Sequence, residues 1–374
     1  MTHRLAILMA TAGVVWATTA CGSDDGETKQ PNKVVVRDPV ADSPFKPVEI
    51  ETAVNSLVTE IGKAPAKTMS MAILLKELIG YWQPVVTGAN RAVTELEVTG
   101  DVLGNTATTP EEQLAQQRQM FQEKLAAGYN AFGIAPMATP VVEDINAAVA
   151  KGAPVVTIDS DQDTSNRQIY LGTINSEAGK TGGTTLKGLL TATSGTVVIL
   201  GTTDTTWPDG MQRTQGAQDV LAAAGYTVVV RSTTWTDTGE TEDVDSMTST
   251  IQTASPPVVG MLGLFSVAFR CAMAAEKAGK TASDVTIVGF DFDANTVKYM
   301  QSGMIKATHA QRQYYMGYMA PYVLYGISAL GLDKTKTLLG SQLNGARFNT
   351  GLDVVQSSQL DAYNAFLDSL GVSQ

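Results

Sequence analysis

Residues 153–180 read APVVTIDSDQDTSNRQIYLGTINSEAGK, and this stretch decides how the whole chain is interpreted. It opens as a buried apolar strand, ends that strand in the acidic sequence DSD at residues 159–161, and continues to a second short strand at residues 170–174. Acidic residues that directly follow a buried parallel strand lie where open α/β sheets bind ligands, at the carboxyl edge. We therefore expect this stretch to hold part of a polar ligand and then to carry the chain into a second lobe.

The remainder of the body repeats one unit, in which a helix is followed by a glycine stop and an apolar strand. The helix expected at residues 109–127 shows the unit well, with Thr109 as its N-cap, Pro110 at its first position and Gly128 directly after it. Such alternation predicts right-handed crossovers between parallel strands with helices on both faces of each sheet. The predicted fold class is α/β, with doubly wound parallel sheets.

Two successive sets of these units predict two lobes, because the last part of the chain does not form a third set. We expect the chain to cross between the lobes near residue 175, to return near Gln311 and to cross again near residue 345. The N-terminal lobe then comprises residues 67–174 and 311–344. The C-terminal lobe comprises residues 175–310 and 345–374.

The first 20 residues are typical of a secretory signal sequence. An apolar run at residues 5–17 follows Arg4, and it is too short to remain as a membrane-spanning helix. The small residues before Cys21 resemble a bacterial lipobox, which implies that a lipid is attached to Cys21; the alternative is ordinary cleavage near Ala20. Residues 21–66 are rich in Asp, Glu, Lys and Pro, so we predict a flexible tether there, with one short helix near residues 53–61.

Composition excludes several classes of function. The formal net charge of −11 argues against nucleic acid as a partner, because phosphate binding requires a basic surface. The chain has only two Cys and two His, so we expect no disulfide within the folded body, no metal site and no cofactor. No phosphate-binding loop of the type GxxxxGK[ST] occurs.

Short motifs spread over residues 69–370 resemble one known family. They are Lys76 with Tyr81-Trp82, the sequence IDSD at 158–161, Arg213-x-x-Gly216, the sequence VGFD at 288–291, Gln311 before Tyr314-x-x-Gly317, and TGxDVV at 350–355. Together, and in this order, they resemble the type I periplasmic solute-binding proteins of ABC importers, in the branch of ribose-type sugar receptors. The chain departs from that pattern at Ile79-Gly80, at Gln313, and at residues 264–268, where a binding Asn is expected.

The resemblance implies a clamp of two lobes with a hinge of three crossings that closes on a carbohydrate. Matched position by position, Tyr81 and Trp82 stack on the sugar ring, and Asp159 accepts hydrogen bonds from two hydroxyls. Gln311 supplies an amide beside the hinge. The other candidate ligand-binding residues are Lys76 and Asp161 in the first lobe, and Arg213, Trp235 and Asp291 in the second.

The chemistry of these side chains suits a sugar independently of the family. A carboxylate accepts hydrogen bonds from adjacent hydroxyls, an arginine donates a planar pair, and an aromatic ring covers the C–H face. Each candidate also has a structural interpretation. Asp291 could cap the helix at 294–301, Asp161 could pair with Arg167, Arg213 could form a surface ion pair, Trp235 could pack in the core, and Lys76 could end its strand in solvent.

The leading hypothesis is an exported, membrane-tethered monomer that closes on a monosaccharide-like ligand and delivers it to an ABC permease. A second hypothesis keeps the clamp but makes it a receptor, for a sugar or an autoinducer-2-like compound, that signals to a membrane kinase. A transcriptional repressor is disfavoured, because a signal sequence stands where a DNA-binding helix-turn-helix would be needed. A glycosidase using Asp159 and Asp291 is also disfavoured, and we predict that the protein is not an enzyme.

Overall fold

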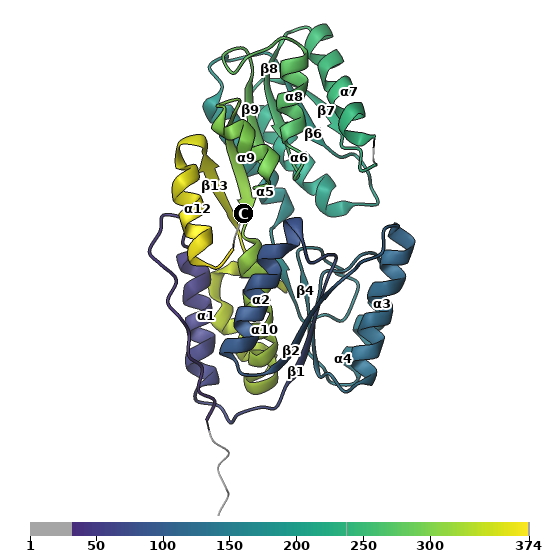
Figure 1. Ribbon diagram of the computed structural model, residues 1–374, viewed down its shortest axis with the longest axis vertical. Helices are drawn as coiled ribbons and strands as arrows, with labels where there is room; N and C mark the ends of the chain where they lie inside the picture. The colour runs from purple at the N-terminus through teal and green to yellow at the C-terminus, as the bar shows by residue number, and fades with distance from the viewer. Residues whose placement is uncertain (1–31, 237, 373–374) are drawn as a thin grey trace, which may run out of the picture.

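The computed structural model describes residues 32–236 and 238–372, which form two α/β lobes stacked along the long axis of the molecule (Figure 1). The predicted signal sequence at residues 1–20 and the predicted lipidation of Cys21 lie outside the described residues. One lobe contains a seven-stranded sheet and the other a six-stranded sheet, and most neighbouring strands are parallel. The predicted fold class, two doubly wound lobes, is confirmed.

The N-terminal lobe is built on the sheet β11-β12-β5-β4-β3-β1-β2. Its strands are β1 (Ser70–Leu75), β2 (Thr99–Gly104), β3 (Ala131–Ile134), β4 (Val155–Ile158), β5 (Ile169–Gly172), β11 (Leu343–Asn344) and β12 (Arg347–Asn349). Its helices are α1 (Val48–Ile61), η1 (Gly80–Trp82), α2 (Gln83–Glu95), α3 (Pro110–Ala126), α4 (Val141–Ala150), α10 (Gln313–Leu330), α11 (Leu332–Leu339) and η2 (Gly340–Gln342). Strands β3 and β4 are buried along their whole length, as expected for parallel strands covered by helices on both faces.

The C-terminal lobe is built on the sheet β13-β10-β9-β8-β6-β7. Its strands are β6 (Thr196–Gly201), β7 (Thr227–Ser232), β8 (Val258–Gly263), β9 (Thr286–Phe290), β10 (Ile305–Gln311) and β13 (Leu352–Gln356). Its helices are α5 (Asn175–Leu189), α6 (Pro208–Ala223), α7 (Gly239–Thr253), α8 (Phe269–Lys277) and α9 (Ala294–Gln301), and η3 (Ser357–Gln359) leads into α12 (Leu360–Ser369). Only β13 runs antiparallel to its neighbour β10, because the chain enters it from the other lobe.

The hinge consists of three chain crossings, of which two lie where the sequence predicted them. The chain leaves the first lobe between β5 and α5 and returns at Arg312, between β10 and α10. The third crossing was predicted at residues 344–345, which is wrong: it lies at residues 350–351. Residues 347–349 form β12, which pairs with β5 in the N-terminal lobe, and three residues are too few to show a strand pattern in the sequence.

Residues 32–66 are not a flexible tether, contrary to the prediction for residues 21–66. Helix α1 packs against α10 of the N-terminal lobe and buries Val54 and Leu57 completely. The segment before α1 is held by Arg37, which donates to the Tyr318 hydroxyl at 2.7 Å and to Glu51 at 2.9 Å. The segment therefore belongs to the lobe, because the apolar face of α1 finds its partner on α10.

Helix α10 is a buried helix of the first lobe. Its residues Tyr314, Tyr315, Tyr318, Tyr322 and Tyr325 are all at most 2% exposed. Helices α2 and α10 approach each other closely at two glycines. A Cβ atom on Gly88 would lie 2.1 Å from the Tyr314 carbonyl oxygen, and one on Gly317 would lie 2.0 Å from the Val85 carbonyl oxygen. Glycine at both positions lets α10 pack closely against α2, the helix that follows Tyr81 and Trp82.

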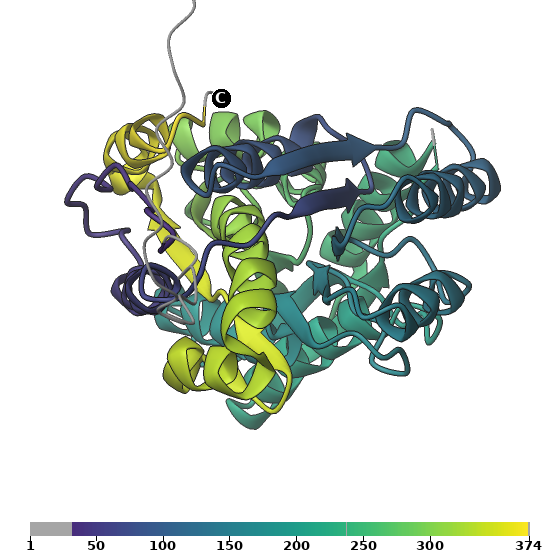
Figure 2. The ribbon, with the colours of Figure 1, turned by 90° about the horizontal axis from the view of Figure 1, so that it is seen from below.

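The C-terminal helix α12 lies beside the hinge, above α1 in Figure 1. The view from below, in Figure 2, shows α10 lying across the sheet of the first lobe and α12 at the periphery. Tyr363 of α12 packs on Phe45 from the N-terminal segment and on Phe292 from the second lobe, at ring distances of 4.9 and 4.7 Å. Within the described ranges, no helix is both long and apolar enough to cross a membrane.

Candidate functional site

Two carboxylates, one from each lobe, stand in an unusual backbone conformation at the ends of their strands. Asp159 follows β4 with φ of 63°, and Asp291 follows β9 with φ of 62°. Among the described residues other than glycine, only Glu97 shares a positive φ. Non-glycine residues adopt this region at an energetic cost, and such cases concentrate at functional sites. The backbone thus turns both side chains away from their strands, toward the cleft between the lobes.

The first-lobe wall of the cleft gathers around Asp159. The Tyr81 hydroxyl donates to Asp159 Oδ1 at 2.6 Å, and Lys76 Nζ donates to Ser160 Oγ at 2.6 Å. Lys76 also lies 5.9 Å from the centre of the Trp82 ring. Lys76 therefore does not end its strand in solvent but reaches the loop that carries Asp159. Trp82 is only 7% exposed, and it packs edge-on against Tyr81 at 5.2 Å.

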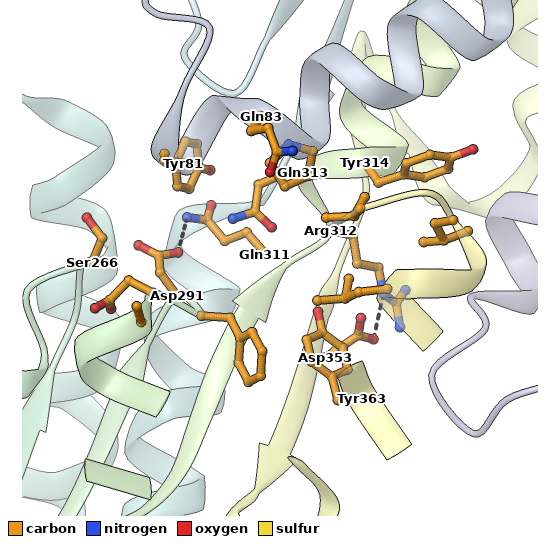
Figure 3. A pocket seen from close by; sticks show the side chains of 18 of the residues that line it. Tyr81, Gln83, Ser266, Asp291, Gln311, Arg312, Gln313, Tyr314, Asp353 and Tyr363 are labelled. Carbon is orange, nitrogen blue, oxygen red and sulfur yellow. Dashed lines mark hydrogen bonds and ion pairs between the residues drawn. The ribbon is translucent and has the colours of Figure 1, made fainter. Parts of the chain in front are cut away.

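The second-lobe wall is organised around Arg213, which is buried and not a surface residue. Its Nε and Nη2 donate to Asn175 Oδ1 at 2.9 and 2.6 Å, and its Nη1 donates to the Leu264 carbonyl at 2.9 Å. Its Nη2 also reaches Gln311 Oε1 at 3.1 Å. In turn, Gln311 Nε2 donates to Asp291 Oδ1 at 2.9 Å, and Figure 3 shows this contact. Arg213, Gln311 and Asp291 thus form one hydrogen-bonded network beside the hinge.

Burial makes the Asp291 carboxyl group a weaker acid. Asp291 is 5% exposed, and burial raises its pKa from 3.8 to about 6, although Arg213 and the Gln311 hydrogen bond oppose that shift. The pKa of the Tyr81 hydroxyl is also raised, by burial and then by the charges of Asp159 and Asp291. Groups from both lobes therefore influence one another electrostatically across the cleft. Asp291 does not cap α9, because Asp293 accepts the hydrogen bonds from Asn295 N and Thr296 N.

Asp161 has a structural role, which is one of the two that the sequence left open. Its Oδ1 accepts from Thr157 and Arg167 at 2.7 and 2.8 Å, and its Oδ2 accepts from Arg167 and Arg347 at 2.6 and 2.5 Å. Burial by itself would raise the pKa of Asp161, but the arginine partners lower it below its ordinary value. With both oxygens engaged, Asp161 fixes the loop after β4 and ties it to β12.

Three aromatic rings from different loops form a cluster on the second lobe. The Trp207 ring lies 4.6 Å from Phe265 and 6.1 Å from Trp235, and Trp235 lies 6.0 Å from Phe265. The Arg213 guanidinium lies 5.6 Å from the Phe265 ring, which places the cluster next to the arginine. Trp235 is 56% exposed, so it is not a core residue. More than half of its surface is open to solvent.

Sequence reasoning missed three residues of this site. The side chain of Asn175, at the start of α5, accepts from Arg213 and caps no helix. Trp207 stands before α6 in the sequence TTDTTW. Asp209 lies one helical turn before Arg213, and its pKa is raised by burial and by the nearby charge of Asp159. The spacing of Asp209 and Arg213 by four residues on a predicted helix was the available signal.

The residues present do not form a metal centre. Within residues 32–236 and 238–372, no group of three or more His, Cys, Asp or Glu side chains could hold a metal ion. His309, the histidine in that part of the chain, is fully buried between Gly289 O and Thr185 Oγ1 at 2.9 and 2.8 Å. Burial lowers its pKa to about 4, so it stays neutral in the core.

Comparisons with known proteins agree with this architecture. A family profile described as a periplasmic binding protein domain matches residues 73–331. No curated protein sequence matches the chain. Many solved structures do match. In those described below, the matched region comprises roughly four-fifths of this chain and nearly the whole of the other chain.

Three of these structures illustrate the likeness. The glucose-galactose binding protein GanP from Geobacillus stearothermophilus is 26% identical, with a TM-score of 0.61 over 79% of this chain and 99% of that one. The arabinose binding protein AraP from the same organism is 22% identical, with a TM-score of 0.65 over 78% and 98%. A chain in the XylFII-LytSN complex is 23% identical, with a TM-score of 0.60 over 78% and 99%.

Proposed function

The chain belongs to the periplasmic binding protein family, and from this premise we propose that it captures a monosaccharide-like ligand between its two lobes and delivers it to an ABC importer. The observation that carries the proposal is the pair Asp159 and Asp291. These carboxylates come from opposite lobes, and both are held in a costly backbone conformation at the cleft. A ligand with several hydroxyls can donate to both of them at once.

The other cleft groups complement this chemistry. Arg213 and Lys76 supply donors, and Tyr81 and Trp235 supply ring faces for the C–H side of a sugar. A hydrogen bond to a charged group contributes about 1.5–3 kcal/mol, so a few of them account for micromolar affinity. Nothing in this arrangement needs a catalytic step, and we propose that the protein binds its ligand without transforming it.

Closure of the clamp would follow from contacts that only the closed form can make. A ligand held by Asp159 in one lobe and by Asp291 in the other favours the form in which both carboxylates reach it. The importer would then recognise the closed form, and the energy for transport would come from a separate ATPase. We propose that the receptor acts as a monomer in this cycle.

We also propose that the protein is exported and held at the membrane by a lipid on Cys21. This proposal rests on the signal-like first 20 residues and the small residues before Cys21. Metabolic labelling with a radioactive or clickable fatty acid tests it. Incorporation that Cys21→Ser abolishes would support lipidation, whereas unlabelled protein released into the medium would show ordinary cleavage.

A second candidate output is signalling, in which the closed clamp reports ligand occupancy to a membrane kinase. The observation in its favour is the similarity to a chain found in a two-protein complex with LytSN. Co-purification of the protein with either a permease or a sensor from its own membrane, with and without ligand, distinguishes transport from signalling.

A thermal-shift screen over pentoses, hexoses, polyols and autoinducer-2 tests ligand capture directly. A ligand that binds only the folded protein raises the melting temperature by mass action. We expect at least one monosaccharide to do so in the wild type and to lose the effect in Asp291→Asn. The exposed residue Glu143 on α4 provides a control variant, Glu143→Gln, which should respond as the wild type does. If no sugar or polyol shifts the melting temperature, the proposal fails.

A further inference from the structure

A cavity of about 680 Å³ lies beside the hinge and shares Tyr81, Asp291 and Gln311 with the candidate site (Figure 3). Its other lining residues come from the loop before η1, from α2, α8, α10 and β13, from the start of α9, and from α12 with the residues after it. Asp159, Arg213 and Trp235 do not line it. The cavity therefore extends from the carboxylate Asp291 away from the rest of the sugar site, as a side chamber of the cleft.

The chamber lining is polar around Asp291 and Gln311, at the start of α9 and at the ion pair of Arg312 with Asp353, and it is apolar along α12. Asp291 and Gln311 stand at the inner end, where the sugar is proposed to bind. The outer wall is contributed by α12 and the residues after it, through Phe366, Leu367, Leu370 and Val372. These four side chains are at most 8% exposed and offer the chamber no hydrogen-bonding group. The chamber thus matches a ligand with a hydroxylated end and an apolar end.

The apolar wall is held in place from three sides. Tyr363 packs on Phe45 and on Phe292 at 4.9 and 4.7 Å. Beyond the end of α12, a Cβ atom on Gly371 would lie 3.8 Å from Thr87 Cγ2, which places this end against α2. At the hinge, Arg312 Nε donates to Asp353 Oδ1 at 2.9 Å. The wall therefore contacts residues of both lobes at the hinge.

We propose that the natural ligand is a glycoside: its sugar ring binds between Asp159 and Asp291, and its apolar aglycone occupies the chamber walled by α12. This inference rests on the proposed function and specifies its ligand class. A monosaccharide alone would leave the chamber to water in contact with four apolar side chains. Transfer of a ring-sized apolar group from water into the chamber is favourable in proportion to the area it buries.

Isothermal titration calorimetry with the most stabilising monosaccharide, its phenyl glycosides (both anomers) and a disaccharide of the same sugar tests the inference. We expect one phenyl glycoside to bind at least about tenfold more tightly than the free sugar. Ala294→Trp, at the chamber lining, should remove this gain and leave the affinity for the free sugar unchanged. Asn295→Trp fills the same chamber from the next residue and serves if Ala294→Trp does not fold.

Ala147→Trp on the exposed face of α4 is the matched control and should retain the full gain. Equal affinity for the free sugar and both phenyl glycosides would overturn the inference, as would tighter binding of the disaccharide than of either phenyl glycoside. Equal weakening of sugar and glycoside by Ala294→Trp would also overturn it. In each of these outcomes the sugar still binds, so the proposed function survives; it fails only if no sugar binds at all.

Discussion

Asp159 and Asp291 end the fourth strand of their respective lobes, yet the two lobes surround them differently. Both have positive φ, and each backbone N–H donates to a neighbouring strand, at Leu171 O and at His309 O. Asp159 is partly exposed and accepts from the Tyr81 hydroxyl, whereas Asp291 is 5% exposed and accepts from Gln311. The repeated unit gives both residues the same backbone geometry. The side chains around each carboxylate determine how well it is shielded from water.

The largest effect is expected from Arg213→Met, because the second lobe depends on this buried cation. The substitution leaves Asn175 Oδ1, the Leu264 carbonyl and Gln311 Oε1 without their donor. Unfolding in urea should show a loss of about 3 kcal/mol or more, and sugar binding should become undetectable. Arg231→Met is the control: this arginine on β7 contacts Thr250 and should cost far less. Equal losses in both variants would contradict the central role of Arg213.

Replacing the two carboxylates one at a time tests their difference directly. Asp159→Asn and Asp291→Asn should each weaken sugar binding by roughly 10- to 100-fold, since each removes charge-assisted hydrogen bonds. Their effects on the free energy of unfolding at pH 7.5 should differ. Asp291→Asn should stabilise the ligand-free protein because it removes a buried charge, and Asp159→Asn should change it by less than about 0.5 kcal/mol. If both substitutions stabilised the protein equally, the two carboxylates would not differ in the cost of their charge.

The pH dependence of stability provides a second measure of the same difference. The folded pKa of Asp291, about 6, lies above its ordinary value of 3.8, so the folded state binds the proton more tightly than the unfolded state. The buried negative charge of Asp291 therefore destabilises the folded protein fully above pH 6, and this destabilisation disappears as the pH falls toward 4. The free energy of unfolding of the wild type, minus that of Asp291→Asn, should therefore rise by about 2 kcal/mol or more between pH 7.5 and pH 4.

The subtraction cancels the contribution of His309, whose lowered pKa has the opposite effect on stability over this range. A flat difference curve for Asp291→Asn would show that the folded protein leaves Asp291 with an ordinary pKa.

The smallest effect is expected from Tyr81→Phe. It removes only the hydroxyl that donates to Asp159, and this partly exposed carboxylate can accept from water instead. We expect sugar affinity to fall by less than about fivefold and stability by about 1 kcal/mol or less. Tyr170→Phe in the same lobe is a contrasting variant. Its fully buried hydroxyl bridges the Asp159 and Thr173 carbonyls, so its loss should cost more stability than the loss at Tyr81.

The repeating helix–glycine–strand pattern predicted most strands and helices of both lobes, because each unit has its own apolar period and its own caps. The pattern failed where an element depends on a distant partner. Helix α1 has apolar residues at Ile50, Val54, Leu57 and Ile61, and this helical face packs against α10 and α11. Strand β12 is three residues long and exists because β5 offers it an edge.

The candidate site was predicted in the same uneven way. Residues at strand ends, such as Asp159 and Asp291, could be recognised because parallel strands place their carboxyl ends at one edge. Asn175 and Asp209 could not be assigned in this way. Asn175 contacts Arg213, and Asp209 lies near the charge of Asp159. In both cases the partner is distant in the sequence.

The two doubly wound lobes and the positions of the acidic strand ends could be predicted from the residues alone, since these features depend on local periodicity and on the geometry of parallel sheets. Contacts between distant parts of the chain are the reason that Asp161 fixes a loop while Asp291 is a buried carboxylate of raised pKa. Such contacts also form the chamber beside the hinge and pack the segment before the first strand on its lobe. Charge state, cavity and docking depend on which side chains approach through space, and no local pattern in the chain encodes that.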